Sequence, residues 1–231
     1  MELIKGSELS EALTCGIIYG APGAGKTTAL PFILPKKRKL IIDIDRSSQV
    51  LQSKKVREKV PGLTEAMEYV DILKVGLDLK KWVEAVEWLE NGAASKYALV
   101  AVDNATELEH QMLTAYGRLG KNDGAPELLH YNRVQFKMID YVRRFRALGT
   151  NVIFTAWEER QEVTFVSGEK YTHTVPRFSG KSLDNICGLC NVVAHIELGK
   201  EQRFFRLERT KEIYAKDQIQ GRAYCAISEL I

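Results

Sequence analysis

Apolar runs alternate with amphipathic segments along most of the chain, a pattern typical of an α/β protein. Short runs rich in β-branched and other apolar residues predict strands at 15–19, 40–45, 69–75, 97–103 and 151–156. Apolar residues at three-and-four spacing predict helices at 78–91, 105–118 and 128–148. The run at 97–103 is almost continuously hydrophobic, which suits a central parallel strand buried on both faces.

The pattern changes after about residue 160. A β-hairpin is predicted at 162–174, and a loop at 176–181 leads to a short helix. Strands then follow at 192–198 and around 204–208 and 223–227. We therefore predict one α/β domain over residues 1–231, a three-layer sandwich with a mainly parallel sheet and an antiparallel far edge. Its parts are a lead-in at 1–13, a core at 14–160 and a hairpin-rich part at 161–231.

The most specific motif follows the first predicted strand directly. Residues 20–27 match the phosphate-binding loop pattern G-x-x-x-x-G-K-[ST]. Its glycines let the backbone turn tightly and point N–H groups at a polyphosphate, and the next helix adds its positive dipole end. Lys26 supplies a cation and Thr27 a hydroxyl for Mg²⁺, so the pattern indicates a nucleoside triphosphate. The predicted nucleotide-binding residues are Gly20, Ala21, Pro22, Gly23, Ala24, Gly25, Lys26, Thr27 and Thr28.

An acidic residue ends the apolar run at 97–103. Ligands of open α/β sheets lie beyond the carboxyl ends of the strands, so Asp103 should meet the phosphate-binding loop there. Hydrolysis of a nucleotide needs an acid that organises Mg²⁺. We therefore predict that Thr27 and Asp103 hold the metal ion together.

A second acid is the candidate for positioning the attacking water. Asp45 alternates with Asp43 on one face of its strand and lies nearer the carboxyl end, so Asp45 is the predicted residue. Asp43, Asn104 and Glu107 are alternatives, and Asp45 can also be explained as a cap of the next segment. Thr155, at the end of another strand, is a candidate γ-phosphate sensor.

Composition limits the functional classes. With 231 residues and 45% hydrophobic residues, the chain is ordinary for a globular protein. Its net charge of +3 is too small to indicate nucleic-acid binding by itself. No apolar stretch approaches the roughly 20 residues that span a bilayer, and the N-terminus lacks a secretory layout, so we expect a cytoplasmic protein without membrane contact. We expect Cys187 and Cys190 to be small buried side chains rather than a metal site.

Further short motifs follow the phosphate-binding loop in a consistent order. They are IDID at 42–45, LVAVDN at 99–104, PRFSGK at 176–181 and YAKD at 214–217. With this order, residues 14–228 resemble the phage-encoded RecA-like ATPases known as phage nucleotide-binding proteins, some of which are ATP-dependent single-strand annealing proteins. The chain departs from that family's pattern at Asn191, where an Asp is expected, and at Gln218, where an Arg is expected.

The resemblance implies a RecA-like P-loop NTPase sandwich with ATP and Mg²⁺ as cofactors. It also implies assembly into a homo-oligomeric ring or filament, and a role in phage DNA recombination or replication in a bacterial host. The implied partners are single-stranded DNA and a single-strand binding protein.

Local features add to the expectation of DNA binding. Basic and aromatic residues mix between positions 160 and 181, as they do in loops that grip single strands. A solvated surface is the alternative explanation. The candidate DNA-binding residues are Lys170, Arg177 and Lys181, with Phe165, Tyr171 and Phe178 as the aromatic residues.

The tail carries a candidate catalytic cation. Lys216 lies in the stretch that resembles the family, where RecA-like proteins reach a neighbour's nucleotide with a basic side chain. Arg209 and Lys211 lie near it, and all three residues can also be explained as solubilising charges on an edge strand.

Two other functions remain open at the level of the sequence. A P-loop kinase of small molecules would need an arginine-rich lid over the phosphates, and no compact lid motif follows the run at 97–103. A nucleotide-dependent scaffold would share the binding loop but show negligible turnover.

Overall fold

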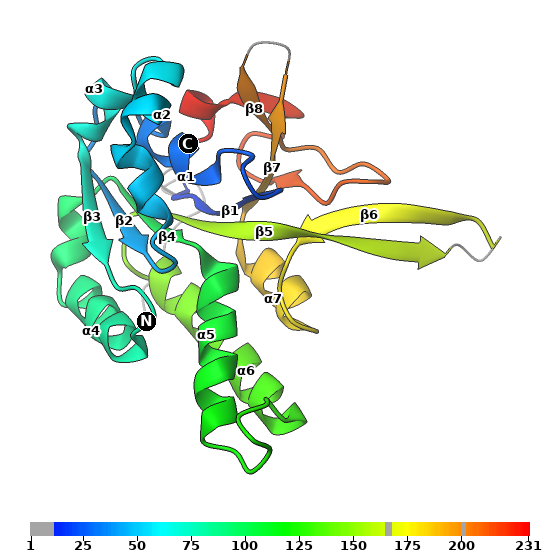
Figure 1. Cartoon of the computed structure of the whole chain (residues 1–231). Coiled ribbons are helices and arrows are strands. Elements are labelled where there is room, and N and C mark those ends of the chain that lie inside the picture. Colours follow the sequence, from blue (N-terminus) through cyan, green and yellow to red (C-terminus); the bar gives the residue numbers. More distant parts are fainter. Residues whose placement is uncertain (1–11, 165–167, 200–201) are drawn as a thin grey trace, which may run out of the picture.

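The computed structural model describes residues 12–164, 168–199 and 202–231. These residues form a single twisted sheet with helices on both faces (Figure 1). Within them, the main path of the sheet has the strand order β10-β8-β7-β1-β5-β4-β2-β3, while β6 pairs with β5 and β9 pairs with β7.

Six parallel strands form the centre of the sheet. They are β1 (Cys15–Gly20), β2 (Lys39–Asp43), β3 (Val70–Lys74), β4 (Leu99–Asp103), β5 (Asn151–Thr164) and β7 (Val192–Leu198). β1, β2 and β4 are buried along their whole length because helices cover both faces, which explains their near-continuous apolar sequences. β5 lies between β1 and β4, with Phe154 opposite Ile17 on one side and Val102 on the other. The arrangement confirms the predicted sandwich with a mainly parallel sheet.

Two hydrophobic cores lie on opposite faces of the sheet. Ile17 and Tyr19 belong to one core and Ile18 to the other, as the alternation along a strand requires. The first core is covered by α4 (Leu79–Glu90), α5 (Ala105–Arg118), α6 (Leu128–Arg146) and α7 (Ser182–Leu189). The second is covered by α1 (Lys26–Ala29), α2 (Lys54–Lys59), α3 (Leu63–Met67) and the 3-10 turns η2 (Leu30–Phe32) and η3 (Ser47–Gln52). Two further 3-10 turns are η4 (Ala93–Lys96) and η5 (Ile227–Glu229).

The C-terminal part completes one edge of the sheet with antiparallel strands. β8 (Arg203–Arg206) pairs with β7, β10 (Tyr224–Ala226) pairs with β8, and the short β9 (Lys216–Asp217) pairs with the start of β7. This antiparallel edge was predicted from the sequence and is confirmed. All four cysteines are buried, as expected, and the Sγ atoms of Cys15 and Cys190 lie 3.9 Å apart.

The hairpin is longer than predicted. The sequence suggested a strand at 151–156 and a separate hairpin from 162, whereas β5 continues without a break to Thr164 and pairs with β6 (Lys170–Pro176) from Glu158 onward. Figure 1 shows β5 and β6 extending together well beyond the body of the molecule. The polar residues from Glu158 onward therefore belong to a ribbon outside the central path of the sheet, and the side chains of Glu159–Glu162 in it are exposed.

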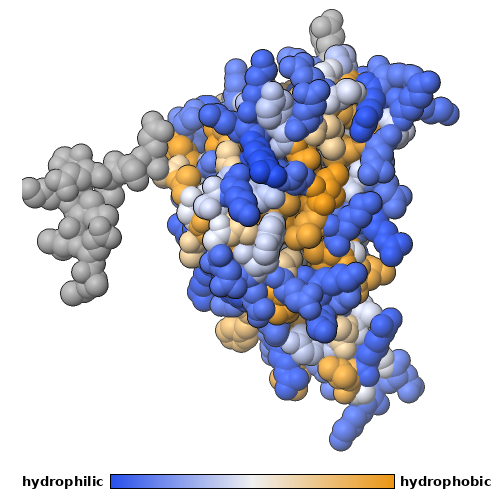
Figure 2. Space-filling model, turned by 90° about the vertical axis from the view of Figure 1, so that its left-hand side faces the viewer, coloured by the Kyte–Doolittle hydropathy of each residue, from blue (hydrophilic) through white to orange (hydrophobic). Residues whose placement is uncertain are grey.

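The opposite edge of the sheet is β3, which pairs with β2 alone among the described residues. Its residues are half-buried except for the exposed Lys74. Figure 2 looks onto this side of the molecule and shows a band of hydrophobic surface between hydrophilic residues. No helix of the described residues is long and apolar enough to cross a membrane.

Candidate functional site

The phosphate-binding loop connects the carboxyl end of β1 to the start of α1. Gly23 and Gly25 have φ angles of 78° and 100°, which residues other than glycine rarely adopt. Gly25 also has no room for a Cβ atom, which would lie 2.5 Å from Nε of Arg203. Both observations explain why this part of the loop needs glycine.

Lys26 is folded back onto its own loop. Its Nζ donates hydrogen bonds to the carbonyl oxygens of Gly20 and Ala21, at 2.7 and 3.0 Å. Burial lowers the pKa of Lys26, and the nearby carboxylates of Asp103, Glu158 and Asp45 oppose that shift. The ammonium group is therefore held beside the loop by two neutral carbonyls that a phosphate could replace.

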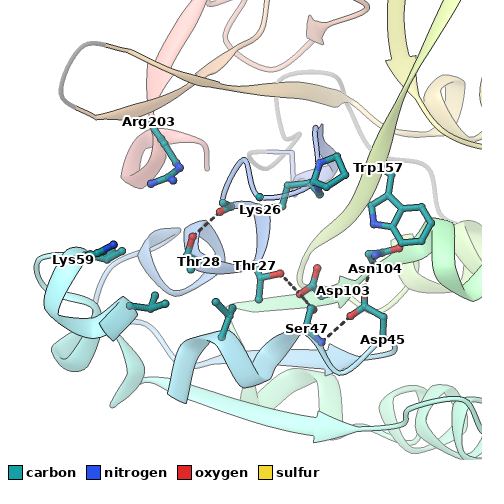
Figure 3. Close-up of a pocket in the computed structure, with 16 residues that line it drawn as sticks. Lys26, Thr27, Thr28, Asp45, Ser47, Lys59, Asp103, Asn104, Trp157 and Arg203 are labelled. Atoms are coloured by element: carbon teal, nitrogen blue, oxygen red, sulfur yellow. Dashed lines mark hydrogen bonds between the residues drawn. The ribbon is translucent and has the colours of Figure 1, made fainter. Parts of the chain in front are cut away.

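Asp103 lies at the centre of a hydroxyl cluster (Figure 3). Its Oδ2 accepts hydrogen bonds from Oγ1 of Thr27 at 2.8 Å and from Oγ of Ser47 at 2.7 Å. Its Oδ1 accepts a hydrogen bond from Oγ1 of Thr155. Burial raises the pKa of Asp103, which is only 2% exposed, and the three hydroxyl groups oppose the shift. The structure thus brings together the two residues predicted to hold Mg²⁺, Thr27 and Asp103.

Asp45 forms a second polar cluster beside the first. Its Oδ2 accepts a hydrogen bond from Nδ2 of Asn104 at 2.6 Å, and its Oδ1 accepts one from the backbone N–H of Ser47 at 2.9 Å. Oδ1 of Asn104 in turn caps α5 by accepting from the N–H of Glu107 at 2.7 Å. Asp45 therefore caps a turn, as the alternative explanation held, and also lines the cavity described below.

Asp43 does not share this position. β2 ends at Asp43, so strand alternation does not extend to Asp45, and the expectation that both carboxylates lie on one face is wrong. The carboxylate of Asp43 accepts a hydrogen bond from Oγ of Ser48 and lines a separate pocket with Arg46 and Lys74.

These groups surround one cavity of about 720 Å³ at the carboxyl ends of β1, β2 and β4. Figure 3 shows Asp45, Asn104 and Trp157 at one end, and Arg203 and Lys59 at the other. The cavity is lined by Pro22, Gly23, Gly25, Lys26, Thr27, Thr28, Asp45, Ser47, Val50, Val56, Lys59, Val60, Asp103, Asn104, Trp157 and Arg203.

Several candidates from the sequence are not among the residues that line this cavity, and Thr155 and Lys216 are two of them. Thr155 is fully buried beneath Asp103, so it supports that carboxylate and does not face a γ-phosphate as a sensor would. Lys216 pairs with Val193 in the amino-terminal half of β7, which in turn pairs with β1. Lys216 therefore lines no part of its own chain's cavity, and action on a neighbouring subunit stays a prediction.

The DNA-binding candidates are spread along the hairpin and its base. Lys170 is near the tip, where its Nζ forms an ion pair with Glu162 at 2.7 Å. Arg177 follows β6 and lies over the ring of Trp157, 6.0 Å from its centroid, while Lys181 directly precedes α7. Of the aromatic candidates, Phe178 is only 4% exposed and belongs to the core, so it is not available to stack on a base. Phe165 lies outside the described residues, and Tyr171 is half-buried.

Several residues of the cavity were not predicted from the sequence, among them Ser47, Trp157 and Arg203. Ser47 could have been found from the sequence, because it lies two residues after Asp45, which ends a predicted strand. Trp157 also follows a predicted strand end. Nothing in the sequence pointed to Arg203. Its Nε contacts the carbonyl oxygen of Ala24, which is 179 positions away in the sequence, only in the folded chain.

Comparisons with known proteins give a family for this fold. No curated protein matches the sequence. Among solved structures, a KaiC-like protein from the hyperthermophilic archaeon Pyrococcus horikoshii OT3 is similar, with 13% identity over 86% of this chain and 80% of that chain and a TM-score of 0.46. A protein-family model described as an AAA domain matches residues 13–219. This match covers most of the sequence, and the chain therefore belongs to the AAA domain family.

Proposed function

We propose that this protein is a Mg²⁺-dependent ATPase that acts on single-stranded DNA in phage recombination or replication, as an annealing-type RecA-like protein. One observation carries the hydrolytic part: Oγ1 of Thr27 lies 2.8 Å from Oδ2 of Asp103, next to Lys26. A phosphate-binding loop joined in this way to a strand-end acid is what nucleotide hydrolysis requires.

The residues around Asp103 suit magnesium. Mg²⁺ prefers hard oxygen ligands and usually binds one or two carboxylates together with phosphate oxygens. Thr27 and Ser47 supply hydroxyl oxygens and Asp103 supplies the carboxylate, which is buried and held by three hydrogen bonds. When bound, the ion neutralises charge on the β- and γ-phosphates.

Asp45 is in a position to act on water. Its two oxygens are fixed by Asn104 and by the backbone of Ser47, so the carboxylate keeps one orientation in the cavity. In this proposal Asp45 accepts a proton from the water that attacks the γ-phosphate, and Lys26 leaves its two carbonyl partners to contact the phosphates.

The DNA-binding part of the proposal is supported by the hairpin. β5 runs directly from Trp157 in the cavity into the extended ribbon of β5 and β6 (Figure 1). Lys170, at the start of β6, and Arg177, directly after it, are seven residues apart, about 23 Å at the usual rise of a strand. Positive charges distributed over such a length suit a DNA backbone better than a small anion.

The proposal includes a trans role for Lys216, which lies apart from its own chain's cavity. In a ring or filament, Lys216 would contact the phosphates bound by a neighbouring subunit and stabilise the transition state. To test this, inactive Lys216→Ala subunits are mixed with inactive Lys26→Ala subunits, which retain Lys216. Activity should reappear in the mixture, and its absence in mixed oligomers shown to form would remove the trans role.

One experiment tests the function as a whole. The rate of ATP hydrolysis is measured with and without a single-stranded oligonucleotide, together with phosphoryl transfer to nucleosides. We expect hydrolysis that DNA stimulates, and DNA affinity that is higher with ATP than with ADP and falls steeply with salt. Negligible DNA affinity in both nucleotide states at low salt would exclude the DNA role. Transfer to nucleosides would indicate a kinase, and nucleotide binding without turnover would indicate a scaffold.

The DNA contacts are tested separately by equilibrium binding at several salt concentrations. Replacing Lys170, Arg177 and Lys181 by glutamine should weaken binding and make its salt dependence shallower, because fewer phosphates are neutralised. As a control, Lys55→Gln removes an exposed lysine on α2, which lies on the other side of the cavity from the hairpin. Equal effects of the two changes would mean that the hairpin is not the DNA-binding element.

A further inference from the structure

The end of the cavity farthest from Asp45 has its own chemistry. Lys59 and Arg203 place two cations there (Figure 3). Three valines, from η3, from α2 and from the end of α2 (Val50, Val56 and Val60), add apolar lining to the same cavity. Figure 3 shows Arg203 and Lys59 near Thr28, away from Asp45, Asn104 and Trp157. We refer to these five residues, Val50, Val56, Lys59, Val60 and Arg203, as the distal wall.

Arg203 is fixed against the phosphate-binding loop. Its Nε donates a hydrogen bond to the carbonyl oxygen of Ala24 at 2.6 Å, and its side chain packs directly on Gly25, whose missing Cβ leaves the room. Among the described residues its two terminal nitrogens have no hydrogen-bond or ion-pair partner. A guanidinium anchored by one edge in this way presents a flat face to the cavity.

The orientation of the bound nucleotide follows from the proposed function, on which this inference rests. Asp45 marks the γ-phosphate end, and Lys26 and Thr27 bind the phosphates next to it. The sugar and base must then extend toward the distal wall. A planar base can stack on a guanidinium and pack its edges against apolar side chains.

We propose that the distal wall is the base-binding subsite of this protein, that Arg203 stacks on the base, and that the subsite accepts adenine and guanine nucleotides alike. The selectivity claim comes from the side chains present. Adenine carries an amino donor where guanine carries a carbonyl acceptor, so a preference for adenine needs a side chain that accepts from the amine, and a preference for guanine needs one that donates to the carbonyl in the plane of the base. In this proposal Arg203 lies against the face of the base, and Lys59 is exposed to water. Valine offers no polar group, and lysine and arginine only donate.

The test measures the affinities of MgADP, MgGDP and magnesium pyrophosphate by calorimetry for the wild type and for Arg203→Lys. Lysine keeps the positive charge but removes the plane on which the base stacks. In the wild type, the affinities for ADP and GDP should agree within about 5-fold. Arg203→Lys should lower both affinities by about 10-fold, as the loss of a stacked guanidinium predicts, and should leave the affinity for pyrophosphate unchanged.

A matched control is Arg209→Lys, because Arg209 lies over Tyr214 and lines no part of the cavity. This change should alter none of the three affinities. Arg203→Ala serves as a second variant and should weaken ADP and GDP at least as much as Arg203→Lys.

Three results would overturn the proposal. A preference of the wild type of 100-fold or more for either diphosphate over the other would refute base tolerance. An equal loss for pyrophosphate in Arg203→Lys would mean that Arg203 contacts the phosphates, and unchanged ADP affinity in both variants would mean that it contacts no part of the nucleotide. Since the assay uses diphosphates without DNA, a protein that binds ADP and GDP as expected but does not hydrolyse ATP would refute the proposed function and leave this inference standing.

Discussion

Thr155→Val should destabilise the protein although it preserves the shape of a fully buried side chain. Oγ1 of Thr155 donates a hydrogen bond to Oδ1 of Asp103, and valine replaces this hydroxyl by a methyl group of nearly the same size. A hydrogen bond to a charged group contributes about 1.5–3 kcal/mol. We therefore expect the free energy of unfolding to fall by about 2 kcal/mol, which lowers the Tm by about 4–8 °C for a chain of this length.

Thr150→Val is the matched control. Thr150 directly precedes β5 and is also buried, with 7% of its surface exposed. Its hydroxyl, however, donates to the neutral carbonyl oxygen of Tyr97, at 2.6 Å. A bond to a neutral acceptor contributes about 1 kcal/mol, so Thr150→Val should cost about half as much. Urea unfolding of both variants at pH 8 measures the difference. Equal losses, or no loss for Thr155→Val, would refute the reasoning that Thr155 supports a charged Asp103.

The pH dependence gives a second check on the same variant. Burial raises the pKa of Asp103, and the loss of the Thr155 hydroxyl should raise it further. A carboxyl group whose pKa is higher in the folded state lowers the stability as the pH rises through that pKa. The cost of Thr155→Val should therefore be fully present above the folded pKa of Asp103 and should shrink as the pH falls below it.

Two further predictions concern Asp45 and the tail. Asp45→Asn should lower kcat about 100-fold with ATP affinity nearly unchanged, because it removes a proton acceptor and keeps the side chain's shape. Single-turnover kinetics with separate binding measurements check this prediction. An unchanged kcat would mean that another residue is the base. Asp217→Asn should lower the free energy of unfolding by about 2 kcal/mol at pH 7, because it weakens the bond from Nε of Arg222 at 2.7 Å. Burial would raise the pKa of Asp217, but bonds from Arg222 and the backbone outweigh it and lower the pKa, so this stability should be present above about pH 4 and fade as the pH falls through the folded pKa.

The central strands and the phosphate-binding loop could be predicted because their signals are local. A buried parallel strand needs a continuous apolar run, and the run that ends in Asp103 has one. The full length of β5 could not be predicted in the same way. Beyond Trp157 the strand leaves the central path of the sheet, both of its faces meet solvent from Glu159 to Glu162, and the apolar pattern that marks a strand disappears.

The remaining errors arose from contacts between distant segments. Thr155 was expected at a strand end, whereas β5 continues past it to Thr164. Its burial depends on β5 lying between β1 and β4, which the sequence does not specify. Arg203, at the start of β8, contacts the phosphate-binding loop only because the fold brings these two segments together. They are far apart in the sequence. The error over Asp43 was of another kind, since it came from extending strand alternation two residues past the end of β2.

The central claim is that Lys26 and Asp103 serve one Mg²⁺-dependent site of ATP hydrolysis. The most direct measurement is phosphate release from ATP by the wild type, by Lys26→Ala and by Asp103→Asn, with Mg²⁺ and after its chelation. We predict turnover by the wild type only when Mg²⁺ is present, and a loss of about 100-fold or more in either variant, since each removes a charge from the phosphate site. Wild-type turnover by a folded Lys26→Ala protein, or hydrolysis that survives chelation, would contradict the claim.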